Sequence, residues 1–135
     1  MKSLFVDSGY WIALENVDDQ NHINALSHWR KLRVGMPQLV TTSYIFDEII
    51  TFFNNRQNHA KAVELGQALL KSSFVEMIHV DEQLFNDSWL YFQKHDDKRY
   101  SLTDCVSFTV MSQRNIEIAL TFDKHFRQAG YQTLP

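Results

Sequence analysis

The sequence contains few of the residues that mark disulfide scaffolds, flexible linkers or membrane spans. Its 135 residues include one cysteine, two prolines and four glycines. A lone Cys105 excludes an internal disulfide and a zinc site built on cysteines, and we interpret it as a small core residue in a reducing compartment. No apolar run approaches the roughly 20 residues that a membrane span needs, and the first residues do not resemble a signal peptide. We therefore expect a cytoplasmic protein with no membrane partner.

The length and charge narrow the possible classes further. The size fits one domain, residues 1–135, and the scarcity of glycine and proline leaves no evident internal boundary. A formal net charge of −3 argues against a protein that coats nucleic acid through a broad basic face. The same charge permits a nuclease whose basic residues are local, because a carboxylate site is itself negative.

Strand-like and helix-like segments alternate along the chain. Apolar runs bounded by turn residues predict strands at 4–6, 38–42, 74–80, 116–122 and 131–133. Apolar residues at helical spacing predict helices at 8–14, 20–33, 43–55, 59–71, from 82 to a charged loop at 94–100, from 101 or 103 to 113, and at 124–129. Asp19 can cap the second of these helices. This alternation predicts a three-layer α/β fold with a central, mainly parallel sheet of four or five strands and helices on both faces.

Four acidic residues stand beside apolar stretches, where an acid is out of character: Asp7, Glu48, Asp104 and Asp123. Burying a charge costs several kcal/mol unless something compensates for it. Asp7 and Asp123 end predicted strands, and ligands of parallel sheets bind at the carboxyl ends of strands. Glu48 and Asp104 lie near the starts of helices at the same edge. We therefore expect the four carboxylates to converge and to hold Mg²⁺ or Mn²⁺.

Each acid also has a simpler interpretation. Asp7 and Asp123 can cap the helices that follow them, and Asp104 can complete a capping box with Ser101. Glu48 lies early in a helix, where the dipole favours an acid. No histidine or cysteine cluster with metal-ligand spacing competes with the carboxylates, and we interpret most of the six histidines as surface or structural residues.

The acids lie in motifs that resemble those of the PIN domain, the nuclease fold shared by VapC-type toxins and several RNA-processing enzymes. The likeness covers nearly the whole chain. The third and fourth motifs are specific when taken together, whereas the second is weak by itself. The motifs are residues 5–14, 42–48, 101–108 and 119–126, the last followed by Gly130 and Tyr131.

The resemblance implies a metal-dependent endoribonuclease in which the four acids hold one or two ions and an activated water attacks the phosphodiester. Ser8 and Thr121 would orient the carboxylates through hydrogen bonds. Asp47, about 100° round the helix from Glu48, is a possible alternative to it, and Asp97 is a second uncertain acid. RNA phosphates could be held by basic residues that flank the acids, although each could equally be solvated: Lys98, Arg99, Lys124, His125 and Arg127.

The preferred function is the toxin of a type II toxin–antitoxin pair, held inactive by a cognate antitoxin and paired as a homodimer. Trp29 and the Phe52–Phe53 pair could contribute to the dimer, although core packing explains each of them better. The alternatives are a housekeeping PIN nuclease for ribosomal RNA processing and a non-catalytic α/β interaction module, whose acids would not converge. A phosphoacceptor receiver domain is disfavoured, because Asp7 has no acidic neighbour.

Overall fold

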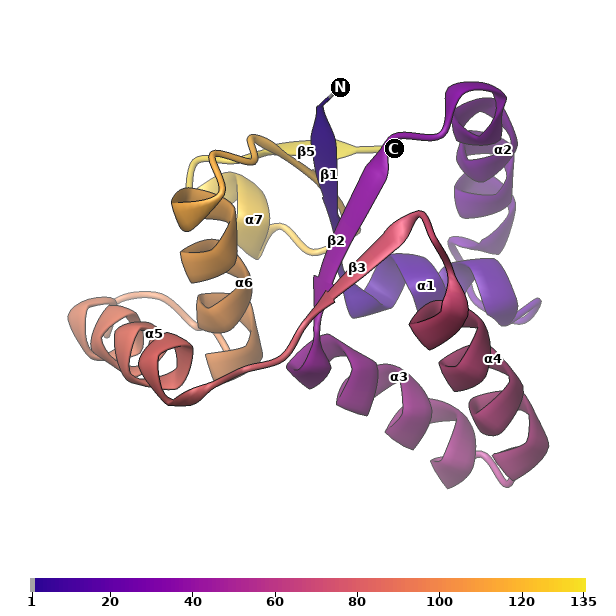
Figure 1. Cartoon of the computed structure of the whole chain (residues 1–135), viewed down its shortest axis with the longest axis horizontal. Coiled ribbons are helices and arrows are strands. Elements are labelled where there is room, and N and C mark those ends of the chain that lie inside the picture. The colour runs from indigo at the N-terminus through magenta and orange to yellow at the C-terminus, as the bar shows by residue number, and fades with distance from the viewer. Residues whose placement is uncertain (1) are drawn as a thin grey trace.

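The computed structural model describes residues 2–135 as a five-stranded parallel sheet with helices on both faces (Figure 1). The spatial order is β3-β2-β1-β4-β5, and every neighbouring pair is parallel. The chain therefore builds outward from β1 in one direction and then returns to build β4 and β5 on its other side. The strands are β1 (Ser3–Val6), β2 (Gln38–Thr42), β3 (Val75–Ile78), β4 (Ile118–Leu120) and β5 (Gln132–Leu134).

The helices divide between the two faces of the sheet (Figure 1). On one side lie α1 (Ser8–Glu15), α2 (His22–Leu32) with a following 3₁₀ turn η1 (Arg33–Gly35), and α4 (His59–Lys71). On the other lie α5 (Glu82–Lys94), α6 (Leu102–Gln113) and α7 (His125–Gln128). The helix α3 (Ser43–Asn55) follows β2 and contacts α1, α4 and α6. The expected three-layer α/β fold is confirmed.

Local capping sets most helix starts. The side chains of Thr42, Asn58, Asp81 and Ser101 each accept a backbone N–H in the first turn of the following helix. The prediction for α2 began two residues too early, because Asp19 does not cap it. Instead, the Asp19 carboxylate accepts the N–H of Asn21 in a tight turn, and the helix starts only at His22.

The third and fourth strands are shorter than predicted. The backbone N–H of Val80 donates to the Ser43 hydroxyl at 2.9 Å rather than to a neighbouring strand, so β3 ends at Ile78. β4 spans only Ile118–Leu120. The apolar character of residues 116–122 comes from burial at both ends of this strand rather than from a longer ladder.

The core is densest where α6 packs on the sheet. Cys105, Val106 and Met111 are fully buried, and burial raises the pKa of the Cys105 thiol to about 11, as expected of a core residue. The Phe108 ring packs edge-on against Tyr100 and Phe126, with centroids 5.0 Å apart in each pair. This aromatic cluster ties α6 to α7. No helix within residues 2–135 has both the length and the apolar character to cross a membrane.

Candidate active site

Asp7 is anchored between the two central strands. It follows β1 directly, and its backbone N–H donates to Leu120 O of β4 at 3.0 Å. One carboxylate oxygen accepts the Ser8 N–H at 2.9 Å, and the other accepts the Thr121 hydroxyl at 2.7 Å. Asp7 therefore caps α1, as its simpler interpretation predicted, and also presents a carboxylate at the carboxyl edge of the sheet.

The Asp7 carboxyl group holds its proton unusually tightly. Its pKa is raised from 3.8 to about 7, mainly because the residue is only 7% exposed. The nearby charges of Asp104 and Glu48 raise the pKa further, and the hydrogen bonds from Thr121 and Ser8 offset only part of the effect. Asp7 therefore lies close enough to Asp104 and Glu48 for their charges to raise its pKa.

Glu48 reaches the same edge from α3. Its carboxylate accepts the Ser8 hydroxyl at 2.8 Å, which joins the segment after β1 to the helix after β2. Although the residue as a whole is exposed, partial desolvation of its carboxyl group raises the pKa of Glu48. The negative charges of Asp104, Asp47 and Asp123 raise it further. The Ser8 hydroxyl therefore forms a hydrogen bond with one of the predicted acids.

Asp104 lies in the first turn of α6, where it caps the helix and is also a neighbour of Asp123 and His125. It forms the capping box with Ser101, whose backbone N–H donates to Asp104 Oδ2 at 3.1 Å and whose hydroxyl accepts the Asp104 N–H at 3.0 Å. The residue is only 7% exposed, and this burial raises its pKa. The charge of Asp123 raises the pKa further, whereas the hydrogen bond with His125 lowers it.

Asp123 and His125 complete the cluster in the turn between β4 and α7. The Asp123 N–H donates to the Thr121 hydroxyl at 3.0 Å, and Asp123 Oδ1 accepts the His125 N–H at 2.9 Å. Thr121 therefore bridges Asp7 and the Asp123 turn. His125 Nδ1 lies 3.0 Å from Asp104 Oδ2 and 3.4 Å from Asp123 Oδ1.

This arrangement fits a divalent cation. One ligand atom from each of Asp104, Asp123 and His125 lies within 4.8 Å of the other two, and no second group this tight occurs among the described residues. No lysine or arginine within residues 2–135 forms an ion pair with any of the four acids. Burial is the main cause of the raised pKa values of Asp7, Glu48 and Asp104, and the negative charges of neighbouring acids raise them further. Oxygen-rich carboxylate clusters of this kind suit hard divalent ions. The cluster could therefore bind a metal ion.

His125 is the site residue whose position the sequence did not predict. The sequence predicts it only as one of the basic residues that could hold phosphates, and no spacing pattern with another histidine marks it as a neighbour of the acids. Its proximity to Asp104 depends on the packing of α6 against α7. A histidine two residues after a strand-ending aspartate is the only sequence signal that could have suggested this position.

The remaining candidates lie outside the acid cluster. Lys98, Arg99 and Lys124 are all exposed, and Lys98 Nζ lies 3.7 Å from the carboxylate of Asp97. The Asp97 carboxylate therefore pairs with the ammonium group of Lys98. Asp47 is exposed and accepts a long hydrogen bond from Thr51, so it does not replace Glu48 in the contact with Ser8.

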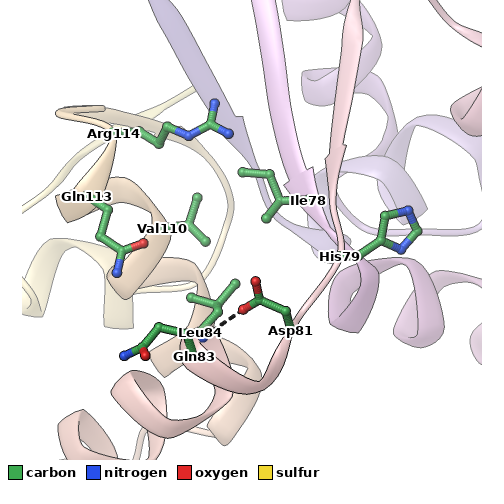
Figure 2. A pocket seen from close by; sticks show the side chains of 8 residues that line it. All are labelled: Ile78, His79, Asp81, Gln83, Leu84, Val110, Gln113 and Arg114. Carbon is green, nitrogen blue, oxygen red and sulfur yellow. Dashed lines mark hydrogen bonds between the residues drawn. The ribbon is translucent and has the colours of Figure 1, made fainter.

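A separate cavity of about 200 Å³ lies where β3 leads into α5, beside α6, and Figure 2 shows its lining. Its only carboxylate, that of Asp81, accepts the Leu84 N–H at 2.9 Å as the cap of α5. Arg114 at its rim donates two hydrogen bonds, of 2.6 and 2.9 Å, to Glu76. None of the four predicted acids lines this cavity, so it is distinct from the acidic edge.

The parallel sheet and the acidic cluster at its carboxyl edge are those of a carboxylate nuclease. The model of the PIN domain matches residues 4–131, and the chain belongs to the PIN domain family. The expected family and fold are thereby confirmed, together with the expected class of activity, a ribonuclease of the toxin type.

Individual relatives cover nearly the full length. The chain is similar to the 23S rRNA-specific endonuclease VapC20 of Mycobacterium tuberculosis, with 34% identity over 128 residues and 95% of each chain covered. The crystal structure of VapC20, described as a sarcin–ricin loop cleaving toxin, superposes with a TM-score of 0.86 at 33% identity over 95% of each chain. The crystal structure of FitAcB from Neisseria gonorrhoeae shares the fold alone, with a TM-score of 0.67 at 15% identity over 98% of this chain and 96% of that one.

Proposed function

We propose that Asp7, Glu48, Asp104 and Asp123 form the catalytic site of an endoribonuclease that hydrolyses RNA phosphodiester bonds with Mg²⁺ or Mn²⁺. The observation that carries this proposal is the convergence of the acids at the carboxyl edge of β1 and β4 without a lysine or arginine partner. The interaction-module alternative requires acids that do not converge, and the mutual electrostatic effects on their pKa values oppose it.

The residues of the chain have distinct parts in this proposal. When bound at the acids, a divalent ion supplies a Lewis acid that activates water and stabilises charge on the phosphoryl group. Ser8 and Thr121 hold the Glu48 and Asp7 carboxylates in place through hydrogen bonds of 2.8 and 2.7 Å. Exposed basic side chains near the cluster position the RNA backbone without reading its sequence: Lys98, Arg99 and Lys124.

The proposed substrate is a structured loop of large-subunit ribosomal RNA. The support is the likeness to VapC20, whose name specifies 23S rRNA and whose structure is described as cleaving the sarcin–ricin loop. The likeness covers 95% of this chain and 95% of VapC20. It favours a toxin over a housekeeping processing enzyme.

A toxin needs an inhibitor, and we assign the antitoxin a groove of about 360 Å³ formed by α1, α2 and α4. Trp11, Leu26, Trp29 and Leu65 give the groove an apolar lining suited to the apolar face of a short helix. Co-purification with the product of an adjoining small gene tests this assignment. We expect Leu26→Glu to abolish the complex, whereas the exposed Leu70→Glu on α4 leaves it intact.

The proposed homodimer uses α5 rather than Trp29 or the Phe52–Phe53 pair. Phe53 is buried and the Trp29 ring packs against Trp11 with centroids 6.0 Å apart, so both serve the core. By contrast, α5 lies at the outer edge of the molecule (Figure 1). Four of its apolar side chains are 38–54% exposed: Phe85, Trp89, Leu90 and Phe92. We expect Trp89→Lys to convert a dimer into a monomer in sedimentation experiments, whereas Leu70→Lys does not.

The catalytic proposal is tested with Asp104→Asn. An asparagine at this position can still accept the Ser101 N–H through its side-chain oxygen, so the capping box and the fold persist. We expect metal-dependent cleavage of ribosomal RNA by the wild type, and loss of cleavage both in EDTA and in the variant. The matched control is Asp97→Asn, which neutralises an exposed acid outside the cluster and leaves cleavage unchanged. Equal cleavage by wild type and Asp104→Asn would refute the site.

A further inference from the structure

The imidazole of His125 occupies an unusual place beside two carboxylates. Its Nδ1 atom lies 3.0 Å from Asp104 Oδ2 and 3.4 Å from Asp123 Oδ1. The Tyr100 ring contacts the imidazole edge-on, with centroids 5.4 Å apart and planes at 80°. The His125 backbone is held by the hydrogen bond from its N–H to Asp123 Oδ1. The backbone and one ring face of His125 are therefore fixed, and Nδ1 points at the acids.

These separations match neighbouring ligands around one ion. Two ligands at right angles on an octahedral ion with bonds of about 2.1 Å lie about 3 Å apart. His125 Nδ1 lies near this separation from each carboxylate oxygen, at 3.0 and 3.4 Å, and one ligand atom from each of the three residues lies within 4.8 Å of the other two. Four acids alone would make an all-oxygen site, whereas His125 adds a nitrogen donor.

We propose that His125 Nδ1 is a direct ligand of the metal ion and gives this site a preference for Mn²⁺ over Mg²⁺. The inference rests on the proposed metal-dependent function and specifies its ion. Mg²⁺ favours oxygen ligands and keeps several waters, whereas neutral imidazole is a better ligand for transition-metal ions. Nδ1 would carry no proton when it binds the ion, and the neutral ring would keep its single proton on Nε2.

The competing role for the same geometry is a hydrogen bond alone, with Nδ1–H donating to Asp104 and orienting it. His125→Asn separates the two roles. The asparagine amide can donate a similar hydrogen bond, but it offers a metal ion only an oxygen. A hydrogen-bonding role therefore survives this substitution, whereas nitrogen coordination does not.

The test measures ion binding directly, on the purified full chain without RNA. Calorimetric titration with Mn²⁺ and Mg²⁺ should show at least tenfold tighter binding of Mn²⁺ to the wild type. We expect His125→Asn to weaken Mn²⁺ binding about tenfold and to change Mg²⁺ binding by no more than about twofold, in line with ligand preferences. The control His59→Asn changes an exposed histidine at the start of α4 and should leave both affinities unchanged.

Pulsed electron paramagnetic resonance of bound Mn²⁺ provides a second readout that does not depend on any variant. A protein containing ¹⁵N-labelled histidine should show the coupling of a directly coordinated nitrogen. Absence of this coupling in the wild type, or equal affinities for the two ions, would overturn the inference. Should His125→Asn fail to fold, as circular dichroism would show, the wild-type spectrum alone still decides the question.

The outcomes also separate this inference from the proposed function. Metal-dependent RNA cleavage without nitrogen coupling refutes the role of His125 and leaves the ribonuclease intact. The opposite result is also informative. If the wild type shows nitrogen coupling but Asp104→Asn cleaves RNA as well as the wild type, His125 is a metal ligand and the catalytic assignment is wrong.

Discussion

The acidic cluster has two halves that manage negative charge differently. In the half formed by Asp7 and Glu48, the partners are the Ser8 and Thr121 hydroxyls and a backbone amide, which orient carboxylates without neutralising them. In the half formed by Asp104 and Asp123, the backbone N–H groups of Ser101 and His125 also donate, but the side-chain partner is the imidazole of His125, which can bind an ion. In the first half Asp7 stays protonated up to about pH 7, because burial, together with the charges of Asp104 and Glu48, raises its pKa to about 7.

The largest effect is expected on cleavage when either half loses a carboxylate. Asp7→Asn and Asp123→Asn should each reduce metal-dependent RNA cleavage by at least about 100-fold, because both halves would contribute to the ion site. Single-turnover cleavage at saturating Mn²⁺ checks this. Full activity in one variant alone would show that only the other half is catalytic.

The pH dependence of stability should differ between the halves. Between about pH 4 and 7 the folded Asp7 keeps a proton that the unfolded chain has lost, so the contribution of Asp7 to stability is complete at low pH and is lost as pH rises through about 7. At about 1.4 kcal/mol per pKa unit, this loss amounts to a few kcal/mol.

Urea unfolding in EDTA at several pH values measures this contribution. We expect Asp7→Asn to be less sensitive to pH than the wild type and more stable than it above pH 7. Addition of Mn²⁺ should stabilise the wild type most at high pH, where the carboxylates are ionised. Parallel pH profiles of the unfolding free energy for wild type and variant would show that Asp7 is not the source of the pH dependence.

The bridge between the halves should have an intermediate effect. Thr121→Val keeps the shape of the side chain but removes the donor to Asp7 and the acceptor for the Asp123 N–H. We expect a loss of about 1–2 kcal/mol in unfolding free energy and of roughly 10- to 100-fold in cleavage or metal affinity. The matched control is Thr109→Val, whose hydroxyl donates only to the Cys105 carbonyl within α6, and it should retain cleavage.

The smallest effect is expected for the exposed basic residues around both halves. Alanine at Lys98, Arg99 or Lys124 should raise KM for RNA by roughly threefold to tenfold and reduce its dependence on salt, because in the proposed function each residue contacts a phosphate. Cleavage measured at low and moderate salt checks this, with exposed Lys71→Ala on α4 as the control. A change in kcat at constant KM would assign the residue to the reaction itself.

Local signals predicted most of the fold. The boundaries of β2, α3 and α4 agree with the sequence because caps and apolar periodicity act within a few residues. The errors occur where a side chain has two local options, as at Asp19, or where a strand ends for lack of a neighbour, as after Ile78. The acids were predicted to meet because parallel strands present their carboxyl ends on one edge.

The sequence by itself determined which carboxylates exist, which helix or turn each belongs to and which edge of the sheet they face. The tertiary structure alone decided how they pair: Thr121 with Asp7 across 114 positions, and His125 with Asp104 across 21. Such contacts depend on the register of β1 against β4 and on the packing of Phe108 against Phe126. Helical and strand periodicity carries no information about these distances, because it describes one segment at a time, whereas a metal site is built between segments.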